Sequence, residues 1–232
     1  IDPVTTVYSG YVGAGEGRNI AVDTQGSAYM VGDTSSNIEE GLPLTPGSSY
    51  LARSNNFDAF VAKFNADGTA LVYAGYIGGT LAEYAPGIAV DSSGNAYVTG
   101  YTDSSAETFP VTGTLGPIRE GYTDTFVAKV NTTGTALVYA GFISGALHEY
   151  GYSIAVDSTG NAYVTGRTDS PATSFPVTVG SGLTSLASFD AFVVKINAAG
   201  TAFEYARFIG GSNDDNGYDI AVDSMGSAYV TG

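Results

Sequence analysis

The sequence predicts an all-β protein, and in particular a β-propeller made of four-stranded repeats of about 66 residues. The first observation is a repeated ten-residue stretch: DSSGNAYVTG at 91–100 returns as DSTGNAYVTG at 157–166 and DSMGSAYVTG at 223–232, and more loosely as DTQGSAYMVG at 23–32. The second is that short runs rich in Val, Ile, Tyr, Phe and Thr are bounded by Gly, Asp, Asn or Ser, which is typical of strands. No segment keeps the apolar spacing of a helix for three turns.

Two further motifs fix the period of the repeat. IAVD begins at Ile20, Ile88, Ile154 and Ile220. DAFVAK at 58 recurs at 124 and 190 as DTFVAK and DAFVVK, so the spacing is 66 residues wherever no loop changes length. We therefore predict one propeller domain over residues 1–232. Its repeat units span roughly residues 1–57, 58–123, 124–189 and 190–232.

Each complete set of the repeat is expected to contain four strands, and one such set consists of residues 87–90, 96–102, 125–130 and 136–143, which spans the boundary at 124. The segments DSSGN and NTTGT separate the first strand from the second and the third from the fourth, and each contains a Gly that suits a tight hairpin. Neighbouring strands are therefore predicted to be antiparallel. The first strand has the smallest side chains, which favours a place near the propeller axis.

The repeated ten residues are expected to form a turn followed by a strand. Asp91 would accept hydrogen bonds from the backbone of its own turn, and Gly94 would supply a positive φ. Tyr97 and Val98 would then point to opposite faces, each buried against an adjacent sheet. The repeated tyrosines are expected to be core residues with hydrogen-bonded hydroxyls; they are Tyr29, Tyr97, Tyr163 and Tyr229.

The stretch DAFVAKFNADGTALVYAGYIGG, the following GIAVDSSGNAYVTGYTDS and the later FPVT resemble the bacterial β-propeller repeat called SBBP. That repeat is similar to NHL-type propellers in its IAVD-x-x-G-N-x-Y-V core. The resemblance spans essentially the whole chain and carries no catalytic signature. It implies an exported or cell-surface bacterial protein.

Counting strands gives a total of fifteen: a leading fourth strand at 5–12, three complete sets, and a trailing pair that ends at Gly232. This is not a whole number of four-stranded sheets. Three arrangements stay open: an excerpt of a longer propeller, a four-bladed ring with one three-stranded sheet, or two chains joined head to tail. Because exposed sheet edges tend to be covered, we expect an excerpt or an assembly, with self-association or a protein partner at the open blade edges.

The antiparallel order places the nearly invariant hairpin turns on one face and the long, dissimilar loops 34–57, 103–123 and 169–189 on the other. Loops of this length are usually functional, so a bound partner is expected to contact this loop-side face. An apolar residue followed by Pro recurs within each long loop and is expected to plug the loop onto the sheet. The three plugs are Leu42-Pro43, Phe109-Pro110 and Phe175-Pro176.

Charge and composition exclude several partners. The net charge is −15, from eight Lys and Arg against 23 Asp and Glu, which disfavours nucleic acid and anionic membrane surfaces. No apolar run is long enough to span a membrane, so no membrane insertion is expected. Three lysines share one repeat position, where pairing with a repeat Asp or a solvated head group is expected; they are Lys63, Lys129 and Lys195.

Two places in the sequence are considered as metal sites. His148 is the only histidine, which is too few for a histidine metal centre, and it is expected to be a surface loop residue. The segment SNDDNGYD at 212–219 offers hard oxygen ligands for calcium from Asp214, Asp215, Asn216 and Asp219. It lacks the closing Glu of an EF-hand loop. The alternative is an acidic turn whose side chains cap backbone groups.

We expect a non-catalytic structural or binding propeller module of an exported protein, without a cofactor unless calcium binds. A calcium- or carbohydrate-binding lectin-like propeller is the alternative, and it should gain thermal stability with calcium or a glycan. A polysaccharide-acting enzyme is the third possibility. An enzyme should show acidic, Tyr or Arg side chains that converge in a pocket on the loop-side face, whereas a scaffold should show none.

Overall fold

The computed structural model describes residues 15–34, 42–45, 56–116, 121–178 and 188–232. Within these ranges the regular elements are fourteen β-strands and no helix, which confirms the all-β prediction. Accordingly, the described chain contains no helix that has the length and apolar character needed to cross a membrane.

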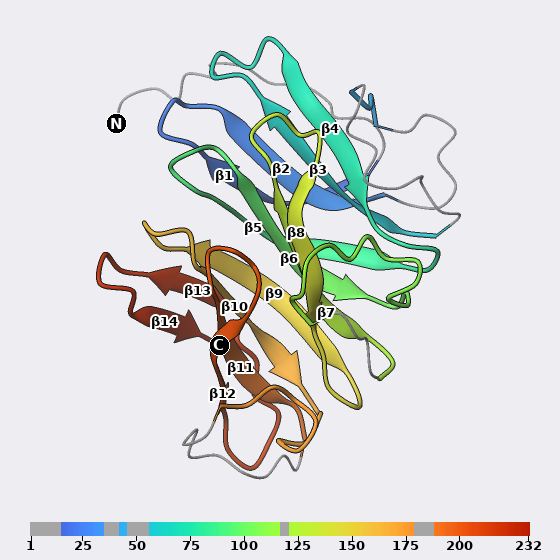
Figure 1. Cartoon of the computed structure of the whole chain (residues 1–232), viewed down its shortest axis with the longest axis vertical. Helices are drawn as coiled ribbons and strands as arrows, with labels where there is room; N and C mark the ends of the chain where they lie inside the picture. The colour runs from blue at the N-terminus through green and yellow to red at the C-terminus, as the bar shows by residue number, and fades with distance from the viewer. Residues whose placement is uncertain (1–14, 35–41, 46–55, 117–120, 179–187) are drawn as a thin grey trace, which may run out of the picture.

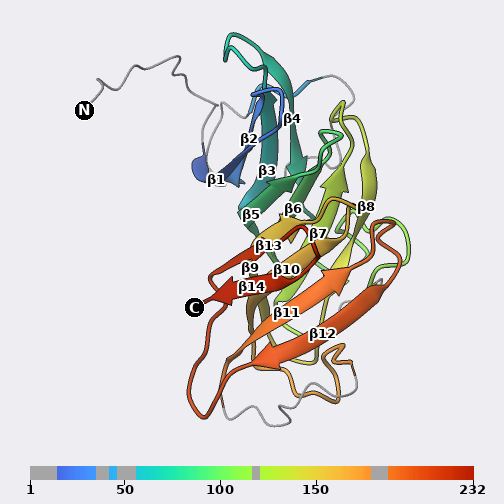
Figure 2. The same ribbon diagram turned by 90° about the vertical axis from the view of Figure 1, so that its left-hand side faces the viewer.

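The strands form three four-stranded antiparallel sheets and a final hairpin, each in chain order. The first sheet contains β1 (Glu16–Val22), β2 (Ala28–Thr34), β3 (Asp58–Phe64) and β4 (Leu71–Ile77). The second contains β5 (Glu83–Val90), β6 (Ala96–Thr102), β7 (Asp124–Val130) and β8 (Leu137–Ile143). The third contains β9 (Glu149–Val156), β10 (Ala162–Thr168), β11 (Asp190–Ile196) and β12 (Phe203–Ile209). The hairpin is formed by β13 (Asp219–Val222) and β14 (Ala228–Thr231). The sheets follow one another from the upper to the lower part of both views (Figures 1 and 2).

The predicted strand order is confirmed, with one notable shift in a boundary. The expected first strand 87–90 begins earlier, at Glu83, because a bulge between Tyr84 and Gly87 lets pairing with β6 continue past Pro86. The expected leading strand at 5–12 lies outside the described residues. The three sheets begin at Glu16, Glu83 and Glu149. The expected repeat boundaries at 58, 124 and 190 coincide instead with the third strand of each sheet, so they fall within sheets. The extent of a single domain over 1–232 stays a prediction.

The turn between β5 and β6 has the predicted chemistry. The Asp91 carboxylate accepts hydrogen bonds from the amides of Ser93 (3.0 Å) and Asn95 (2.9 Å). Gly94 has a φ of 87°, in the left-handed region that favours glycine. The repeated sequence is therefore explained locally by the needs of one tight turn.

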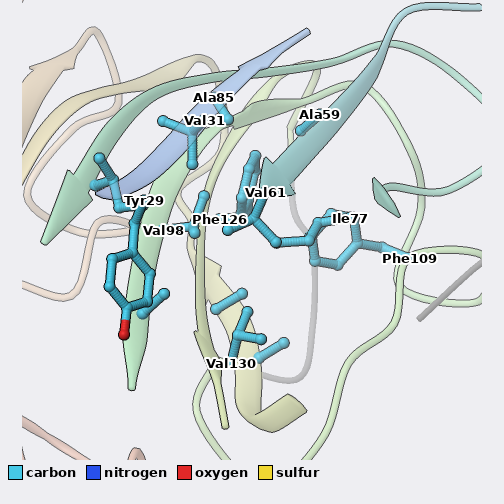
Figure 3. Packing of buried hydrophobic residues seen from close by; sticks show 14 of the residues in the cluster. Tyr29, Val31, Ala59, Val61, Ile77, Ala85, Val98, Phe109, Phe126 and Val130 are labelled. Atoms are coloured by element: carbon cyan, nitrogen blue, oxygen red, sulfur yellow. The ribbon is translucent and has the colours of Figure 1, made fainter. Parts of the chain in front are cut away.

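Alternate residues of each inner strand pack against different neighbouring sheets. Val98 and Phe126 lie in one core with Tyr29 and Val61 of the first sheet (Figure 3). Tyr97 lies instead in the core shared with the third sheet. A single four-stranded sheet thus buries both of its faces only with a neighbour on each side, and this confirms the propeller architecture.

The first strands of adjacent sheets approach closely, as their small side chains predicted. A Cβ atom built on Gly87 of β5 would lie 3.2 Å from the Cα of Ser153 in β9 and 2.7 Å from the Cγ2 of Thr99. A side chain on Gly87 would therefore crowd both Thr99 and the backbone of β9.

The repeated tyrosines tie each sheet to the next. The Tyr97 hydroxyl lies 3.2 Å from the Asp91 carboxylate in its own turn and 3.1 Å from the Gly160 carbonyl in the next sheet. Tyr29 and Tyr163 make the same pair of contacts, whereas Tyr229 contacts only its own Asp223 and is 59% exposed. The prediction of buried, hydrogen-bonded tyrosines is confirmed for the first three.

The loop plugs are also confirmed. Phe109 is 3% exposed, and its ring lies 5.2 Å from the rings of both Phe126 and Phe142. Phe175 and Leu42 occupy the corresponding places on the third and first sheets and are likewise buried.

The outer face of β1 exposes side chains that are buried in every other unit. Ile20 is 62% exposed, whereas its counterparts Ile88, Ile154 and Ile220 are 7%, 4% and 6% exposed. The difference arises because no sheet precedes β1 within the described part of the chain. Self-association through open blade edges stays a prediction.

We expect Tyr97→Phe to lower the free energy of unfolding by about 1–2 kcal/mol, because it removes a buried hydroxyl from between two half-buried acceptors. The matched control is Tyr229→Phe, at the same repeat position on an exposed strand, and it should change stability by less than about 0.5 kcal/mol. Urea denaturation of the two variants measures the difference. Equal losses would contradict a role for the hydroxyl between sheets.

Candidate functional site

Three repeat positions on the first two strands of each sheet differ in chemistry between units. Two lie on the first strand of each sheet, four and two residues before the Ile of IAVD, and the third follows the repeated Gly of the second strand. In the second unit they hold Tyr84, Pro86 and Tyr101. The corresponding residues are Glu16, Arg18 and Asp33 in the first sheet, Tyr150, Tyr152 and Arg167 in the third, and Asn216 and Tyr218 at the hairpin.

Strand pairing brings these positions together at the end of each sheet that carries the long loops. Glu16 pairs with Asp33, Tyr84 with Tyr101, and Tyr150 with Arg167. The repeat thus keeps its turns and core constant while it changes the chemistry of this loop-side face.

A hollow of about 190 Å³ opens at this face where three sheets meet. Its walls are formed by Arg18, Asp33, Tyr84, Pro86, Tyr101 and Tyr152. The first sheet supplies the charged pair, while the second and third sheets supply the tyrosines. Since each wall comes from a different unit, the hollow depends on the stacking of the sheets.

The only carboxylate in the wall is held by the arginine beside it. The Asp33 side chain is 2% exposed, and its two oxygens accept hydrogen bonds from Arg18 Nε at 2.7 Å and Nη2 at 3.1 Å. Glu16 approaches the same guanidinium at 3.0 Å. The hydrogen bond to Asp33 raises the pKa of Arg18, so the guanidinium stays charged and bound to this carboxylate.

The tyrosines of the wall hold their protons. Burial raises the pKa of Tyr84, Tyr101 and Tyr152 above the ordinary value for tyrosine. Their hydroxyls are therefore neutral hydrogen-bonding groups at neutral pH and are poorly suited to act as bases.

A continuous row of rings, the aromatic row, crosses the three sheets beside the hollow. It consists of Phe57, Tyr84, Tyr101, Tyr150 and Phe189. Successive ring centres are 5.4, 5.0, 5.1 and 6.0 Å apart. The guanidinium of Arg167 lies 4.9 Å from the centre of the Tyr150 ring and 4.4 Å from that of Phe189.

His148 adjoins this row and has partners that the sequence did not predict. Its ring stacks with Tyr122 at 5.3 Å and with Tyr150 at 6.2 Å. Nδ1 lies 3.2 Å from an Asp169 oxygen, while the His148 amide donates to the other oxygen at 2.8 Å. The side chain is 34% exposed and fixed rather than loose on the surface.

The four calcium candidates each bind a different neighbour. Asp214, Asp215, Asn216 and Asp219 accept hydrogen bonds, in that order, from the Phe189 amide (3.2 Å), the Gly211 amide (2.7 Å), Arg167 (3.4 Å) and the Ser153 hydroxyl (2.8 Å). Within the described ranges, no three His, Cys, Asp or Glu side chains are grouped so that they could hold a metal ion. Calcium binding stays a prediction.

The lysine prediction is confirmed for Lys63 and Lys129, which approach Asp23 and Asp91 at 3.6 Å. Lys195 pairs with Glu204 at 2.8 Å instead of the repeat Asp. All three ammonium groups also lie over the ring of a repeated tyrosine. These three lysines therefore make ion pairs and ring contacts within the fold.

The sequence did not single out the residues that form the hollow. The recurring residues predicted the turns and the core. The residues of the hollow are instead marked by differences at equal repeat positions, such as the residue after the Gly in VTGYT and VTGRT. Side chains of the kind expected for an enzyme do converge on the loop-side face. However, both oxygens of the wall's single carboxylate are engaged by Arg18 and the tyrosines stay protonated, so the arrangement favours binding over acid–base chemistry.

The stacked four-stranded sheets and their repeated turns define a β-propeller repeat protein. The model of the SBBP β-propeller repeat matches residues 10–39, 72–105, 139–171 and 204–232, together more than half of the chain. The chain belongs to this family, as the sequence resemblance indicated.

One curated relative and one solved structure illustrate the other similarities of this chain. The "Uncharacterized WD repeat-containing protein L264" of Acanthamoeba polyphaga mimivirus is 28% identical, and the match covers 75% of this chain and 14% of that protein. A solved structure titled "Structure of Dos1 propeller" has 9% identity and a TM-score of 0.34, and the match covers 92% of this chain and 64% of that one. The chain thus spans a small part of its viral relative.

Proposed function

We propose that this chain is a non-catalytic binding module of an exported bacterial protein and that it holds a protein partner on its loop-side face. The observation that carries the proposal is the gathering of Tyr and Arg side chains at the three repeat positions around the hollow. Turns and core residues recur because every sheet junction needs them. Of the eleven residues at the three variable positions, five are Tyr and two are Arg.

The composition and size of the site support a protein partner. Tyr and Arg are enriched at the energetic centres of protein interfaces, where rigid rings supply contact area at low entropic cost. A hollow of about 190 Å³ is smaller than the roughly 300–1,000 Å³ of sites for drug-sized molecules. It suits one anchoring side chain of a partner that also covers the aromatic row. The SBBP family resemblance supports export.

The test compares proteins captured by the immobilised wild-type chain and by Tyr101→Ser, from culture medium and surface extracts of the source bacterium. Tyr101 contributes to both the hollow and the aromatic row, so its loss should reduce capture of the partner by about tenfold or more. Quantitative mass spectrometry of the bound proteins measures this ratio.

The matched control is Val138→Ser, at a side chain that is 50% exposed on β8, away from the hollow. It should capture the partner as the wild type does, and thermal unfolding should show that both variants are folded. Identical bound proteins for all three chains, or no specific capture by any of them, would contradict the proposed function.

A further inference from the structure

We propose that Arg167 is the anion-recognition point of the loop-side face and that it binds the carboxylate of an acidic side chain in a partner peptide. The inference rests on the proposed function and adds the chemistry of the partner. It concerns a residue outside the wall of the hollow.

The guanidinium of Arg167 is held in place by two aromatic rings. It lies over the rings of both Tyr150 and Phe189, at 4.9 and 4.4 Å from their centres, and these two rings are tilted against each other with centres 6.0 Å apart. The side chain is half-buried, and its Nε is enclosed without a hydrogen-bond partner. Stacking on aromatic faces fixes the plane of an arginine fork before a ligand arrives, which lowers the entropic cost of binding.

The hydrogen-bonding capacity of Arg167 is largely unused. Its Nη1 donates to the side-chain oxygen of Asn216 at 3.4 Å, and the guanidinium lies close enough to Tyr152 to offset part of the burial that raises the pKa of that hydroxyl. A guanidinium has five N–H donors, and a carboxylate accepts two of them side by side. Both hydrogen-bonding neighbours of Arg167 are uncharged. The Asp214 carboxylate is near enough for the charge of Arg167 to help lower its pKa, but it accepts its hydrogen bonds from Ser188 and Phe189.

Four other cations of the described chain are paired with acids. Arg18 binds Asp33, and the three repeat lysines pair with Asp23, Asp91 and Glu204. Among the described residues, Arg167 has no carboxylate within ion-pairing distance. In a chain with a net charge of −15, an arginine without such a partner stands out as a place for an external anion.

The same charge decides which anion fits. A net charge of −15 repels polyanions, so nucleic acids and polyuronates are disfavoured, whereas one carboxylate on an otherwise uncharged segment is not. The rings of Tyr150, Tyr101 and Phe189 offer apolar contact around the guanidinium. An Asp or Glu flanked by aromatic or aliphatic residues is the peptide that matches this surface.

The experiment is an NMR titration of the intact chain with N-acetyl-Phe-Glu-amide and, in parallel, with its uncharged analogue N-acetyl-Phe-Gln-amide. We expect the Glu peptide to bind the wild type about tenfold more tightly than the Gln peptide, because the charged hydrogen bonds are lost in the analogue. The ratio of the two affinities should fall to about one in Arg167→Gln, since that variant lacks the cation. It should persist in Lys195→Gln, which removes the same charge from the framework.

A third ligand, glucuronate, separates a sugar acid from a peptide. Binding of glucuronate that depends on Arg167, without binding of the Glu peptide, overturns the proposal in favour of an acidic glycan. Absence of any binding, or equal binding of the Glu and Gln peptides, overturns it outright.

The capture experiment distinguishes this inference from the proposed function. If Tyr101→Ser loses the captured partner while Arg167→Gln keeps it, the binding face stands and the carboxylate role of Arg167 fails. If neither variant loses the partner, both fail. Loss in both variants, together with the peptide preference above, supports both.

Discussion

Replacing Phe109 by Ala is expected to lower the free energy of unfolding by about 3–5 kcal/mol, the usual cost of removing a buried phenylalanine ring. The ring is 3% exposed and lies between Phe126 and Phe142 of the second sheet. Its loss leaves a cavity that the strands cannot close, because Phe126 also packs in the core shared with the first sheet.

Chemical denaturation followed by tyrosine fluorescence or circular dichroism measures this loss. Phe175→Ala should show a similar loss, since Phe175 occupies the same place against Phe192 and Phe208. The control is Leu81→Ala, at a loop side chain that is 47% exposed, where a change within about 0.5 kcal/mol is expected. A loss below about 1 kcal/mol for Phe109→Ala would mean that the loop does not depend on its plug.

The protein should become less stable as the pH rises from about 4.5 to 7, chiefly through Glu83, and Glu83→Gln should remove that carboxyl's share. The Glu83 side chain is fully buried where two sheets meet, and it accepts hydrogen bonds from the Gly79 amide (2.9 Å) and the Thr102 hydroxyl (2.7 Å). Burial raises its pKa to about 7, the hydrogen bonds oppose this rise, and the nearby negative charge of Asp58 adds to it.

The direction of the effect follows from proton counting. Between its ordinary pKa of 4.5 and the raised value of about 7, the folded chain keeps a proton on Glu83 that the unfolded chain has released. Stability from this group is therefore complete below pH 4.5 and is lost as the pH rises through 7. For one carboxyl the loss amounts to about 3 kcal/mol.

The same arrangement recurs at the other junctions. Burial raises the pKa of Glu149, which occupies the equivalent position beside Asp124, and also that of Asp190, which faces Asp215. Asp215, one of the four calcium candidates, thus stands at the repeat position of the buried glutamates. Glu149 and Asp190 should steepen the pH dependence of the wild-type chain in the same direction.

Urea denaturation at pH 5 and pH 8 measures the effect in wild type, Glu83→Gln and the control Glu107→Gln, an exposed loop residue. We expect the difference between the two pH values to shrink by about 3 kcal/mol in Glu83→Gln and to be unchanged in the control. A wild-type chain equally stable at both pH values would show that Glu83 ionises freely in the folded state.

The turns and the core could be predicted because every contact between adjacent sheets needs the same residue types at the same spacing. Asp91, Gly94 and Tyr97 recur in type and spacing, and each has a local reason that a single unit reveals. The bulge near Pro86 was missed because a residue without an amide donor interrupts an otherwise regular strand pattern.

The candidate site was not predictable in the same way. Tyr101 and Arg167 occupy one repeat position but share no chemistry, so no pattern marks them, and their neighbours come from other sheets. The carboxyl pair of Asp58 and Glu83 is likewise separated along the chain and meets only when two sheets stack. A sequence pattern predicts contacts within one repeat, but it does not predict contacts between repeats.

The hydroxyl of Tyr97 and the carbonyl of Gly160 meet across a seam whose chemistry is the same as that of the seam before it. A gene in which one 66-residue segment is duplicated or deleted therefore encodes a chain whose new neighbours already fit. Recombination can therefore change the number of sheets while the contacts between adjacent sheets stay the same. The face that carries Tyr101 and Arg167 can then change in sequence independently of those contacts.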